Sequence, residues 1–433
     1  GVCKMSGMKD SGIEWVGEIP NEWEVLRLKY VAIVQTGNTP TKTDQSNYDE
    51  SGILWVKPDN LNEFKPIVET KERISETGLS NARIAQPKAT LVCCIGTVGK
   101  IGFSEEAVAY NQQINAVEFD EDNIFWKYGL YFLSTQQGQH QFYMNGNVVY
   151  ILNSEKHKNI SIVKPPIDIQ QTITNYLDHK CGEIDSVIAA KEKTNALLKE
   201  HRQSIIYEAV TKGLDPTVPM KDSGIEWIGW IPMKWNLDRL KFHATLNPLV
   251  DTSSFQDEDE VSFVPMENLK SGYHFNSTVS YSMVKKGYTQ FNTGDILIAK
   301  VTPCFENGNI AIASDLIRDT GFGSTEINVI RSSDMIVKYL FYYLQNPKFI
   351  ERGIYDMFGV AGLKRLIPGY IIDSFYPIPT RAEQQAIADY LDHKCAEIDS
   401  IIAANNTTIE KLKEYRRSII YETVTGKTDV YQV

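Results

Sequence analysis

The chain has 433 residues, of which 42% are hydrophobic and 23% charged, and its formal net charge at pH 7 is −11. Since one hydrophobic core rarely serves a chain of this length, two or more domains are expected. The acidic balance disfavours a protein that coats itself in nucleic acid unaided. No apolar run approaches the ~20 residues of a membrane span and no secretory signal is evident, so we expect a cytoplasmic protein with no membrane partner.

Cysteine and histidine give no indication of a metal centre or of a disulfide framework. Six cysteines occur without a CxxC spacing, and seven histidines form no HxH or HExxH pattern. Cys181 and Cys395 are expected to act as small buried hydrophobic residues. Residues 1–8 are interpreted as an expression remnant, because Met8 offers a natural start.

The longest repeated stretch lies at residues 170–211 and 384–425, where 28 of 42 aligned positions are identical. Neither copy contains proline, and apolar residues recur seven apart in two stripes. This pattern predicts two long helices, over 166–213 and 380–426, wound on each other as a coiled coil. The residues predicted to form the helix–helix seam are Leu177, Cys181, Ile184, Ile188, Leu198, Ile205, Leu391, Cys395, Ile398, Ile402, Leu412 and Ile419.

A second repeat opens each half of the chain. Residues 9–29 and 221–241 share 14 of 21 positions, including a DSGIEW motif. Because the two repeats have offsets of 212 and 214 residues, the sequence is a tandem duplication of one module. Each half is therefore predicted to run from a start motif through a globular domain, at 9–165 or 214–379, to a long helix.

Both globular regions show a mixed α/β pattern. Short apolar runs bounded by turn residues predict strands, and one short helix follows late in each region. The predicted strands are 53–56, 90–95 and 116–119, then 261–264, 295–299, 310–313 and 327–330, and the predicted helices are 125–134 and 336–344. The two regions are faintly similar, so we expect one shared fold with different surfaces for two related but distinct targets.

The paired motifs resemble the specificity subunit of a Type I restriction-modification enzyme. The DSGIEW openings at Asp10 and Asp222, the YLDHKC helix starts and the SIIYE helix ends at Ser204 and Ser418 carry this resemblance. It implies two target-recognition domains, each reading one half of a bipartite double-stranded DNA sequence from the major groove. It also implies that the long helices pack antiparallel with pseudo-two-fold symmetry, set the unread spacer and dock two methyltransferase subunits, which motor-nuclease subunits then join.

The same resemblance implies a non-catalytic protein, from a bacterium or archaeon, that binds no cofactor or metal itself. S-adenosylmethionine, ATP and magnesium are expected on the partner subunits. The acidic net charge is compatible with this function if the methyltransferase supplies much of the phosphate contact, which carries affinity but no sequence information.

Two alternative functions remain open. A single-chain nuclease or methyltransferase is one, because PD at 58–59 and ETK at 69–71 form a nuclease-like pattern. This spacing is common by chance, however, and NPLV at 247–250 does not fit the (Asp/Asn)-Pro-Pro-aromatic motif of an amino-methyltransferase. The GTVGK sequence at 96–100 also lacks parts of a phosphate loop. The other alternative is a structural adaptor whose globular domains do not read DNA.

Base readout requires side chains that hydrogen-bond to base edges, such as Arg or Lys to guanine and Asn or Gln to adenine. Polar loops of this composition occur at similar places in both regions. The candidates in the first domain are Lys57, Asp59, Asn60, Thr97, Lys100, Asn111, Gln112 and Gln113. Those in the second are Glu267, Asn268, Lys300, Thr302, Asn307, Ser324, Thr325, Glu326, Lys364 and Arg365. A turn-forming or solvated role is the alternative for each single residue.

Charged residues outside the seam recur identically in the two long helices, which favours docking of two copies of one partner over simple solvation. The residues predicted to dock the partner subunits are Lys180, Glu183, Asp185, Lys199, Arg202, Lys394, Glu397, Asp399, Lys413 and Arg416. Within the seam, Lys191, Asn195 and Asn405 interrupt the apolar pattern. Polar residues at such positions can specify register at a cost in stability.

Overall fold

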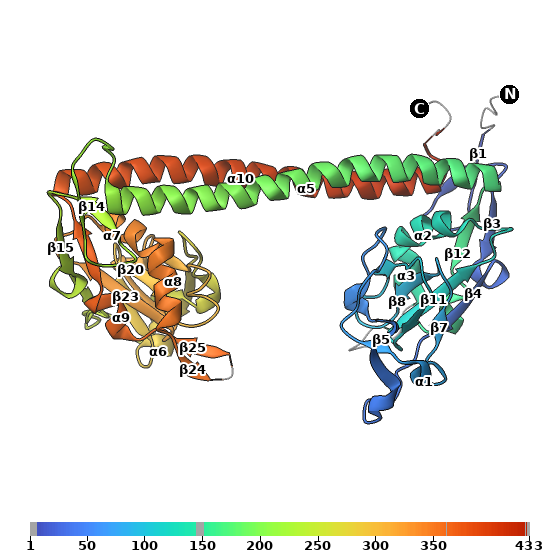
Figure 1. The fold of residues 1–433 in the computed structure, drawn as a ribbon, viewed down its shortest axis with the longest axis horizontal. Coiled ribbons are helices and arrows are strands. Elements are labelled where there is room, and N and C mark those ends of the chain that lie inside the picture. Colours follow the sequence, from blue (N-terminus) through green and yellow to red (C-terminus); the bar gives the residue numbers. More distant parts are fainter. Residues whose placement is uncertain (1–6, 144–150, 361, 429, 431–433) are drawn as a thin grey trace. The chain divides into compact units, whose positions relative to one another are not determined.

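The structure is a computed structural model that describes residues 7–143, 151–360, 362–428 and 430. It divides into two compact units, of which unit 1 comprises Gly1–Lys191 with Thr407–Val433 and unit 2 comprises Glu192–Asn406. Each unit contains one α/β domain and half of each long helix (Figure 1). Most of the remnant predicted at residues 1–8 lies outside the described residues.

The two long helices are α5 (Ile167–Lys212) and α10 (Arg381–Val424), with 46 and 44 residues. Within unit 1, Asp185 of α5 pairs with Arg416 of α10, and further along α5 Ile188 packs with Ile409. Residues with higher numbers in α5 contact residues with lower numbers in α10, so the helices run antiparallel in this unit. The contacts between α5 and α10 in unit 2 follow the same order, so the helices are antiparallel there too. The predicted mixed α/β fold with two long antiparallel helices is confirmed.

Antiparallel packing explains why the compact units differ from the domains expected from the order of the sequence. Unit 1 combines the first globular domain with the start of α5 and the end of α10. Unit 2 combines the second domain with the end of α5 and the start of α10. Each helix therefore contributes its two halves to two different cores.

The residues predicted for the seam lie on the face between the helices. Leu177 and Leu391 are fully buried, at 0% exposure. Cys181, Ile184, Ile188, Cys395, Ile398 and Ile419 are also buried, whereas Leu198, Ile205, Ile402 and Leu412 are half-buried. Near the helix ends the buried face widens to include Ile206 and Ile420, because there the helices pack against their domain as well as against each other.

A hydrogen-bonded asparagine cluster interrupts the seam in unit 2. The Asn195 side chain, only 7% exposed, donates to the Asn406 amide oxygen at 2.9 Å and accepts from the Asn405 amide nitrogen at 2.9 Å. Sliding one helix past the other would leave a buried amide unpaired, which is costly. The cluster is therefore suited to specifying the register predicted from Asn195 and Asn405.

The domain of unit 1 contains two four-stranded sheets, with strand orders β6-β5-β10-β7 and β4-β11-β8-β9. Only β5 and β10 pair in parallel among the strands of these two sheets. The strands are β4 (Ala32–Thr36), β5 (Tyr48–Val56), β6 (Arg73–Ile74), β7 (Ile84–Ala85), β8 (Thr90–Cys93), β9 (Ile101–Gly102), β10 (Val108–Tyr110) and β11 (Ile114–Phe119).

The domain of unit 2 repeats this topology, with strand orders β18-β17-β22-β19 and β16-β23-β20-β21. The parallel pair is now β17 with β22. The strands are β16 (Ala244–Leu246), β17 (Glu260–Val264), β18 (Ser277–Ser280), β19 (Thr289–Asn292), β20 (Ile296–Ala299), β21 (Ile310–Ile312), β22 (Thr320–Gly323) and β23 (Ile327–Ser332). The shared fold expected from the faint sequence similarity is confirmed.

Shorter elements complete each domain in matching order. In both, a two-stranded ribbon joins the beginning of the domain to its end, and the start motif forms a second ribbon. In unit 1 these elements are β1 (Met8–Asp10), β2 (Glu18–Pro20), β3 (Glu24–Arg27), α1 (Glu76–Leu79), α2 (Trp126–Ser134), α3 (Gln137–Tyr143), α4 (Ser154–His157) and β12 (Ser161–Lys164). In unit 2 they are β13 (Met220–Asp222), β14 (Trp230–Pro232), β15 (Asn236–Arg239), α6 (Tyr281–Val284), α7 (Val337–Leu344), α8 (Pro347–Tyr355), β24 (Phe358–Val360), β25 (Leu363–Arg365), α9 (Pro368–Asp373) and β26 (Phe375–Ile378).

Within the described ranges, none of the helices combines the length and the apolar character that a membrane crossing requires.

The first stability prediction concerns the buried face of α10 in unit 2. Leu391→Ala should destabilise unit 2 by about 2–5 kcal/mol, because the substitution opens a cavity in the core. Leu197→Ala serves as a matched control, since this leucine of the same unit is 56% exposed, and should cost less than about 0.5 kcal/mol. Denaturant unfolding of the full chain, followed by hydrogen exchange of unit 2 amides, measures both; equal losses would contradict the packing.

A second prediction concerns two buried histidines in unit 1. His140 is 0% exposed, and neither of its ring nitrogens has a hydrogen-bond partner among the residues that the structure describes. Its ring lies 5.7 Å from that of His157, which is also 0% exposed. Burial lowers the pKa of His140 to about 4. In the unfolded chain the pKa is about 6.5, so the stabilising contribution is complete above that pH and is lost as the pH falls toward 4.

Wild-type stability should therefore fall between pH 7 and pH 5 by about 2 kcal/mol more than that of His140→Leu, which has no imidazole to protonate. His201→Leu, on the exposed side of α5, should retain the wild-type pH dependence. Urea unfolding at the two pH values measures the difference. Identical pH dependence in wild type and His140→Leu would contradict this assignment.

Candidate nucleic-acid interface

The three polar loops predicted in the first domain lie together in the structure. They follow the ends of β5, β8 and β10 and are joined by hydrogen bonds, so we name them the first loop cluster, comprising 57–60, 97–100 and 111–113. The Lys100 Nζ donates to the Pro58 carbonyl at 2.8 Å. The Cys94 N–H next to the second loop donates to the Gln113 carbonyl at 2.7 Å. The loops thus form one continuous surface.

Some of the predicted side chains in this cluster have structural roles. The Asn60 side chain accepts from the Lys57 N–H at 2.9 Å, which closes the short helical turn after β5. Asn111 is only 6% exposed and donates to the Gln113 side-chain oxygen at 3.0 Å. Asp59, Thr97 and Gln112 are exposed, whereas Lys57, Lys100 and Gln113 are half-buried. The exposed and half-buried set is the part that a ligand can reach.

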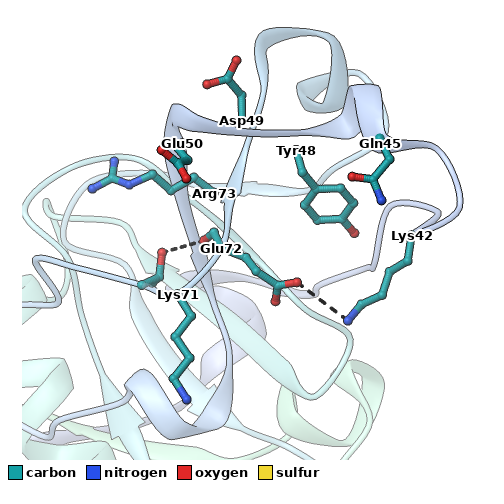
Figure 2. Close-up of a pocket in the computed structure, with 9 residues that line it drawn as sticks. Lys42, Gln45, Tyr48, Asp49, Glu50, Lys71, Glu72 and Arg73 are labelled. Carbon is teal, nitrogen blue, oxygen red and sulfur yellow. Dashed lines mark hydrogen bonds and ion pairs between the residues drawn. The ribbon is translucent and has the colours of Figure 1, made fainter.

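Lys57 connects the first loop cluster to a neighbouring cavity that the sequence did not indicate. Its ammonium group pairs with the Glu72 carboxylate and lies 4.4 Å from the centroid of the Trp55 ring. The hydrogen bond from Lys57 lowers the pKa of Glu72. Glu72 also faces Lys42, at 3.8 Å (Figure 2).

This cavity has a volume of about 540 Å³ and is lined by Lys42, Gln45, Tyr48, Asp49, Glu50, Thr70, Lys71, Glu72 and Arg73. Three of its lining side chains are cationic and three are anionic, as Figure 2 shows. The mixed charge gives no preference for a phosphate over a cation, so the cavity extends the polar surface without indicating a specific ligand.

The four polar segments predicted in the second domain also converge. We name them the second loop cluster, comprising 267–268, 300–302, 324–326 and 364–365. The Lys300 N–H donates to the Glu326 carbonyl at 3.0 Å, and the Ser324 N–H donates to the Val264 carbonyl at 3.1 Å. The Thr302 N–H donates to the Lys364 carbonyl at 3.0 Å. Since the first three segments follow β17, β20 and β22, the second cluster occupies the same place in its domain as the first, and 364–365 of β25 adds to it.

The side chains of the second loop cluster differ in their exposure to solvent. Thr302 accepts from the Lys364 N–H at 3.0 Å and donates to the Gly362 carbonyl at 2.8 Å, so its hydroxyl is used within the protein. Asn268 donates to the Ser277 hydroxyl at 3.3 Å. The exposed residues are Glu267, Thr325, Lys364 and Arg365, and the half-buried ones are Asn268, Lys300, Thr302, Ser324 and Glu326. The predicted residue Asn307 is also exposed and lies outside the second loop cluster as defined.

Four of the ten helix charges predicted to dock a partner form ion pairs between the two helices. In unit 1, Asp185 of α5 accepts from Arg416 of α10 at 2.9 Å. In unit 2, Arg202 of α5 pairs with Asp399 of α10 at 3.3 Å. Because the chain is duplicated, an equivalent ion pair occurs in each unit. The two ion pairs therefore explain why these four charged residues recur, without reference to a partner.

The other predicted docking charges lie along the outer faces of single helices. Lys180 pairs with Glu183 at 3.0 Å and Lys394 with Glu397 at 2.9 Å, each three residues apart. Lys413 is half-buried and pairs with Glu410, and Lys199 is exposed. These residues remain accessible to a second protein, and their role as a docking surface stays a prediction.

The residues that anchor each domain to its long helix were not identified from the sequence. In unit 1, Asp178 of α5 accepts from the Tyr131 hydroxyl at 2.8 Å and from Lys127 at 2.6 Å. In unit 2, Asp392 of α10 accepts in the same way from Tyr342, at 2.8 Å, and from Lys338. The sequence feature that could have indicated these anchors is the YLDHKC motif, which is identical in both copies and includes Asp178 and Asp392.

A glutamine in each long helix completes the anchor. The Gln170 side chain accepts from the Phe125 N–H at 2.8 Å, and the Gln384 side chain accepts from the Ile336 N–H at 2.8 Å. Both glutamines are buried. They bond to the backbone at the start of the late helix of each domain, α2 or α7. The loop clusters are thus carried on domains that are firmly attached to the long helices within each unit.

In the described part of the chain, no group of three or more His, Cys, Asp or Glu side chains is placed to hold a metal ion. The arrangement offers two polar surfaces suited to hydrogen bonding.

Comparison with known proteins connects this arrangement to a family. Residues 20–199 match the family model described as Type I restriction modification DNA specificity domain. The Type I restriction enzyme EcoAI specificity subunit of Escherichia coli is 40% identical over 162 residues, which cover 36% of this chain and 27% of that protein. The match thus spans about a quarter of the length of that relative.

Two further proteins are similar over nearly the whole chain. The Type I restriction enzyme MjaIX specificity subunit of Methanocaldococcus jannaschii is 23% identical over 439 residues, covering 96% of each protein. A chain from a structure concerned with complex assembly and conformational transition of the type I R-M system has 14% identity and a TM-score of 0.70, covering 95% of this chain and 99% of that one. At this identity the structural likeness shows a shared fold.

The pairing of Asp185 with Arg416 can be tested by a double-mutant cycle in the full chain. Their side chains are 31% and 18% exposed, so the pair is better shielded than a surface ion pair. Asp185→Ala and Arg416→Ala should together cost less than the sum of the single substitutions, with a coupling of about 1 kcal/mol. Lys180→Ala with Glu183→Ala is the matched exposed pair and should show a coupling of at most about 0.5 kcal/mol. Additive effects at Asp185 and Arg416 would contradict the cross-helix role.

Proposed function

We propose that this chain is a type I restriction-modification specificity subunit, as the matched family model and the similar proteins support, and that it selects the DNA sequence on which its complex acts. In this proposal the chain has no catalytic site of its own. Its ligand is double-stranded DNA with a bipartite target, and each loop cluster reads one half. The observation that carries the proposal is the presence of two loop clusters at equivalent places in a duplicated fold.

The chemical difference between the two clusters supports two unlike half-sites. Gln113 in the first cluster is at the position equivalent to Glu326 in the second, since each directly precedes one of the equivalent strands β11 and β23. An amide both donates and accepts hydrogen bonds, whereas a carboxylate only accepts them or pairs with a cation. Equivalent positions with different hydrogen-bonding capacity suit the reading of different bases on a common scaffold.

We further propose that α5 and α10 determine the length of the unread spacer and dock two methyltransferase subunits. The seam and the Asn195 cluster resist sliding of one helix on the other, which a spacer of constant length requires. The paired outer charges, such as Lys180–Glu183 and Lys394–Glu397, recur in both helices and suit two copies of one partner. Motor-nuclease subunits would then join through the methyltransferases.

S-adenosylmethionine, ATP and magnesium belong, in this proposal, to the partner subunits. The net charge of −11 supports a division of labour in which the methyltransferase contributes much of the phosphate contact. That contact supplies affinity and salt dependence, while the loop clusters supply sequence preference.

The test uses the full chain assembled with its methyltransferase. Mapping methylated positions by long-read sequencing should yield one bipartite motif. Gln113→Ala should then weaken preference at one position of one half-site by roughly 1–3 kcal/mol, because it removes a group that can hydrogen-bond to a base edge. The matched control is Gln86→Ala, an exposed glutamine of the same domain outside the first loop cluster.

Unchanged selectivity in Gln113→Ala would remove this residue from the reading surface. Equal binding to target and random duplexes by the assembled complex would favour the structural adaptor instead. Cleavage or methylation of DNA by the purified chain alone would contradict the non-catalytic assignment.

A further inference from the structure

A two-stranded ribbon in unit 2 carries two of the predicted DNA-contacting residues. Strands β24 and β25 pair antiparallel, with Phe358 opposite Arg365 and Gly359 opposite Lys364. The ribbon projects from the domain on the side away from the long helices of unit 2 (Figure 1). Phe358 is 81% exposed and Lys364 and Arg365 are exposed. The ribbon therefore presents an aromatic side chain and two cations to solvent.

The base of the ribbon is firmly attached to the second loop cluster. The Thr302 hydroxyl donates to the Gly362 carbonyl, directly before β25, and accepts from the Lys364 N–H within β25. The Leu366 N–H donates to the Lys300 carbonyl at 2.7 Å. An isolated β-bridge joins Val301 to Arg365. Hydrogen bonds to the domain therefore fix the position of the Arg365 backbone, which is not part of a free loop.

The Arg365 side chain is held by a second residue of the same cluster. Its Nε donates to Glu326 Oε2 at 3.0 Å and its Nη2 donates to Glu326 Oε1 at 2.6 Å. This two-point pairing with Arg365 lowers the pKa of the Glu326 carboxyl, and Lys300 adds to the effect. A planar guanidinium held at two points has one preferred orientation, so less freedom is lost when it binds a ligand.

The pairing leaves a specific set of donors available. A guanidinium carries five N–H groups, and Glu326 engages one on Nε and one on Nη2. Among the described residues, nothing accepts from the Arg365 Nη1. Three N–H groups remain, two on Nη1 and one on Nη2, and one hydrogen of each nitrogen forms a two-donor edge on the side opposite Nε.

That edge matches one base in the major groove. Guanine presents two adjacent acceptors there, O6 and N7, and a bidentate arginine is the commonest specific contact to them. The major groove also admits a two-stranded β-ribbon. Both Glu326 oxygens are occupied by Arg365, so Glu326 is better suited to orienting the arginine than to accepting from cytosine.

We propose that the β24–β25 ribbon enters the major groove at the second half-site and that Arg365, oriented by Glu326, reads a guanine there. This inference rests on the proposed function and adds the base and the residue that recognises it. Glu326 acts as a positioning residue, and the assigned contact is between the Nη1–Nη2 edge of Arg365 and the O6 and N7 atoms of one guanine.

The experiment measures binding of the full chain, assembled with its methyltransferase, to duplexes carrying the target motif. Each guanine of the second half-site is replaced in turn by 7-deazaguanine, which lacks N7, or by hypoxanthine, which keeps both O6 and N7. For the wild type, 7-deazaguanine at one position should weaken binding roughly fivefold or more, and hypoxanthine there should leave it nearly unchanged.

In Arg365→Ala the penalty for 7-deazaguanine at that position should vanish, while penalties at other positions persist. Arg365→Lys keeps the charge but not the two-point edge, and should lose most of the discrimination. Glu326→Gln should reduce the penalty partly, because the arginine is held less firmly. Arg318→Ala is the matched control, since Arg318 pairs with Asp259 at 2.9 Å before the start of β17, at the opposite end of that strand from the second loop cluster.

Four outcomes overturn the assignment, and they distinguish failure of the arginine contact from failure of the proposed function. If the wild type prefers its target but no guanine of the second half-site responds to 7-deazaguanine, the arginine contact is wrong and the proposed function stands. The same holds if the response persists in both Arg365 variants, or is lost equally in Arg318→Ala. If the wild-type complex does not distinguish its target from a scrambled duplex, the proposed function itself fails.

Discussion

Burial of the apolar faces of α5 and α10 against each other is the interaction on which the rest of the structure depends. In isolation each helix would leave its apolar face in water, and most of the stability of such a helix comes from the packing of that face. Within each unit the seam supplies the missing apolar contacts and extends directly into the core of the globular domain. Because the helices are antiparallel, the end of one completes the unit that the start of the other begins.

The anchors convert this helix pair into a platform for recognition. A carboxylate on each long helix, Asp178 or Asp392, binds a tyrosine and a lysine of the domain's late helix, and a buried glutamine binds the same helix at its start. These contacts are duplicated because the chain is duplicated. Their identity in the two halves has a structural cause, whereas the loop clusters differ because nothing in the core requires them to be alike.

In the candidate interface, the sequence predicted the positions of the loops better than the roles of the individual residues. The loops of each cluster converge, and most of them border strands that the apolar pattern predicted, although β10 and β22, which precede 111–113 and 324–326, were not predicted. Within them, Asn60, Asn111 and Thr302 bond to neighbouring backbone or side chains, a role that their residue type does not distinguish from base contact. Glu326 pairs with Arg365, 39 positions away, and Lys57 pairs with Glu72. No spacing in the sequence predicts either pair.

The sequence alone determined the duplication, the two long helices to within a few residues, the shared α/β fold and the resemblance to a family. These follow from local periodicity and from internal identity, which can be read without knowing the tertiary contacts. Tertiary structure decided which helix halves share a core, which helix charges pair across the seam, and which polar side chains remain free to meet a ligand. Those outcomes depend on contacts between residues distant in the chain, and only the folded structure brings such residues together.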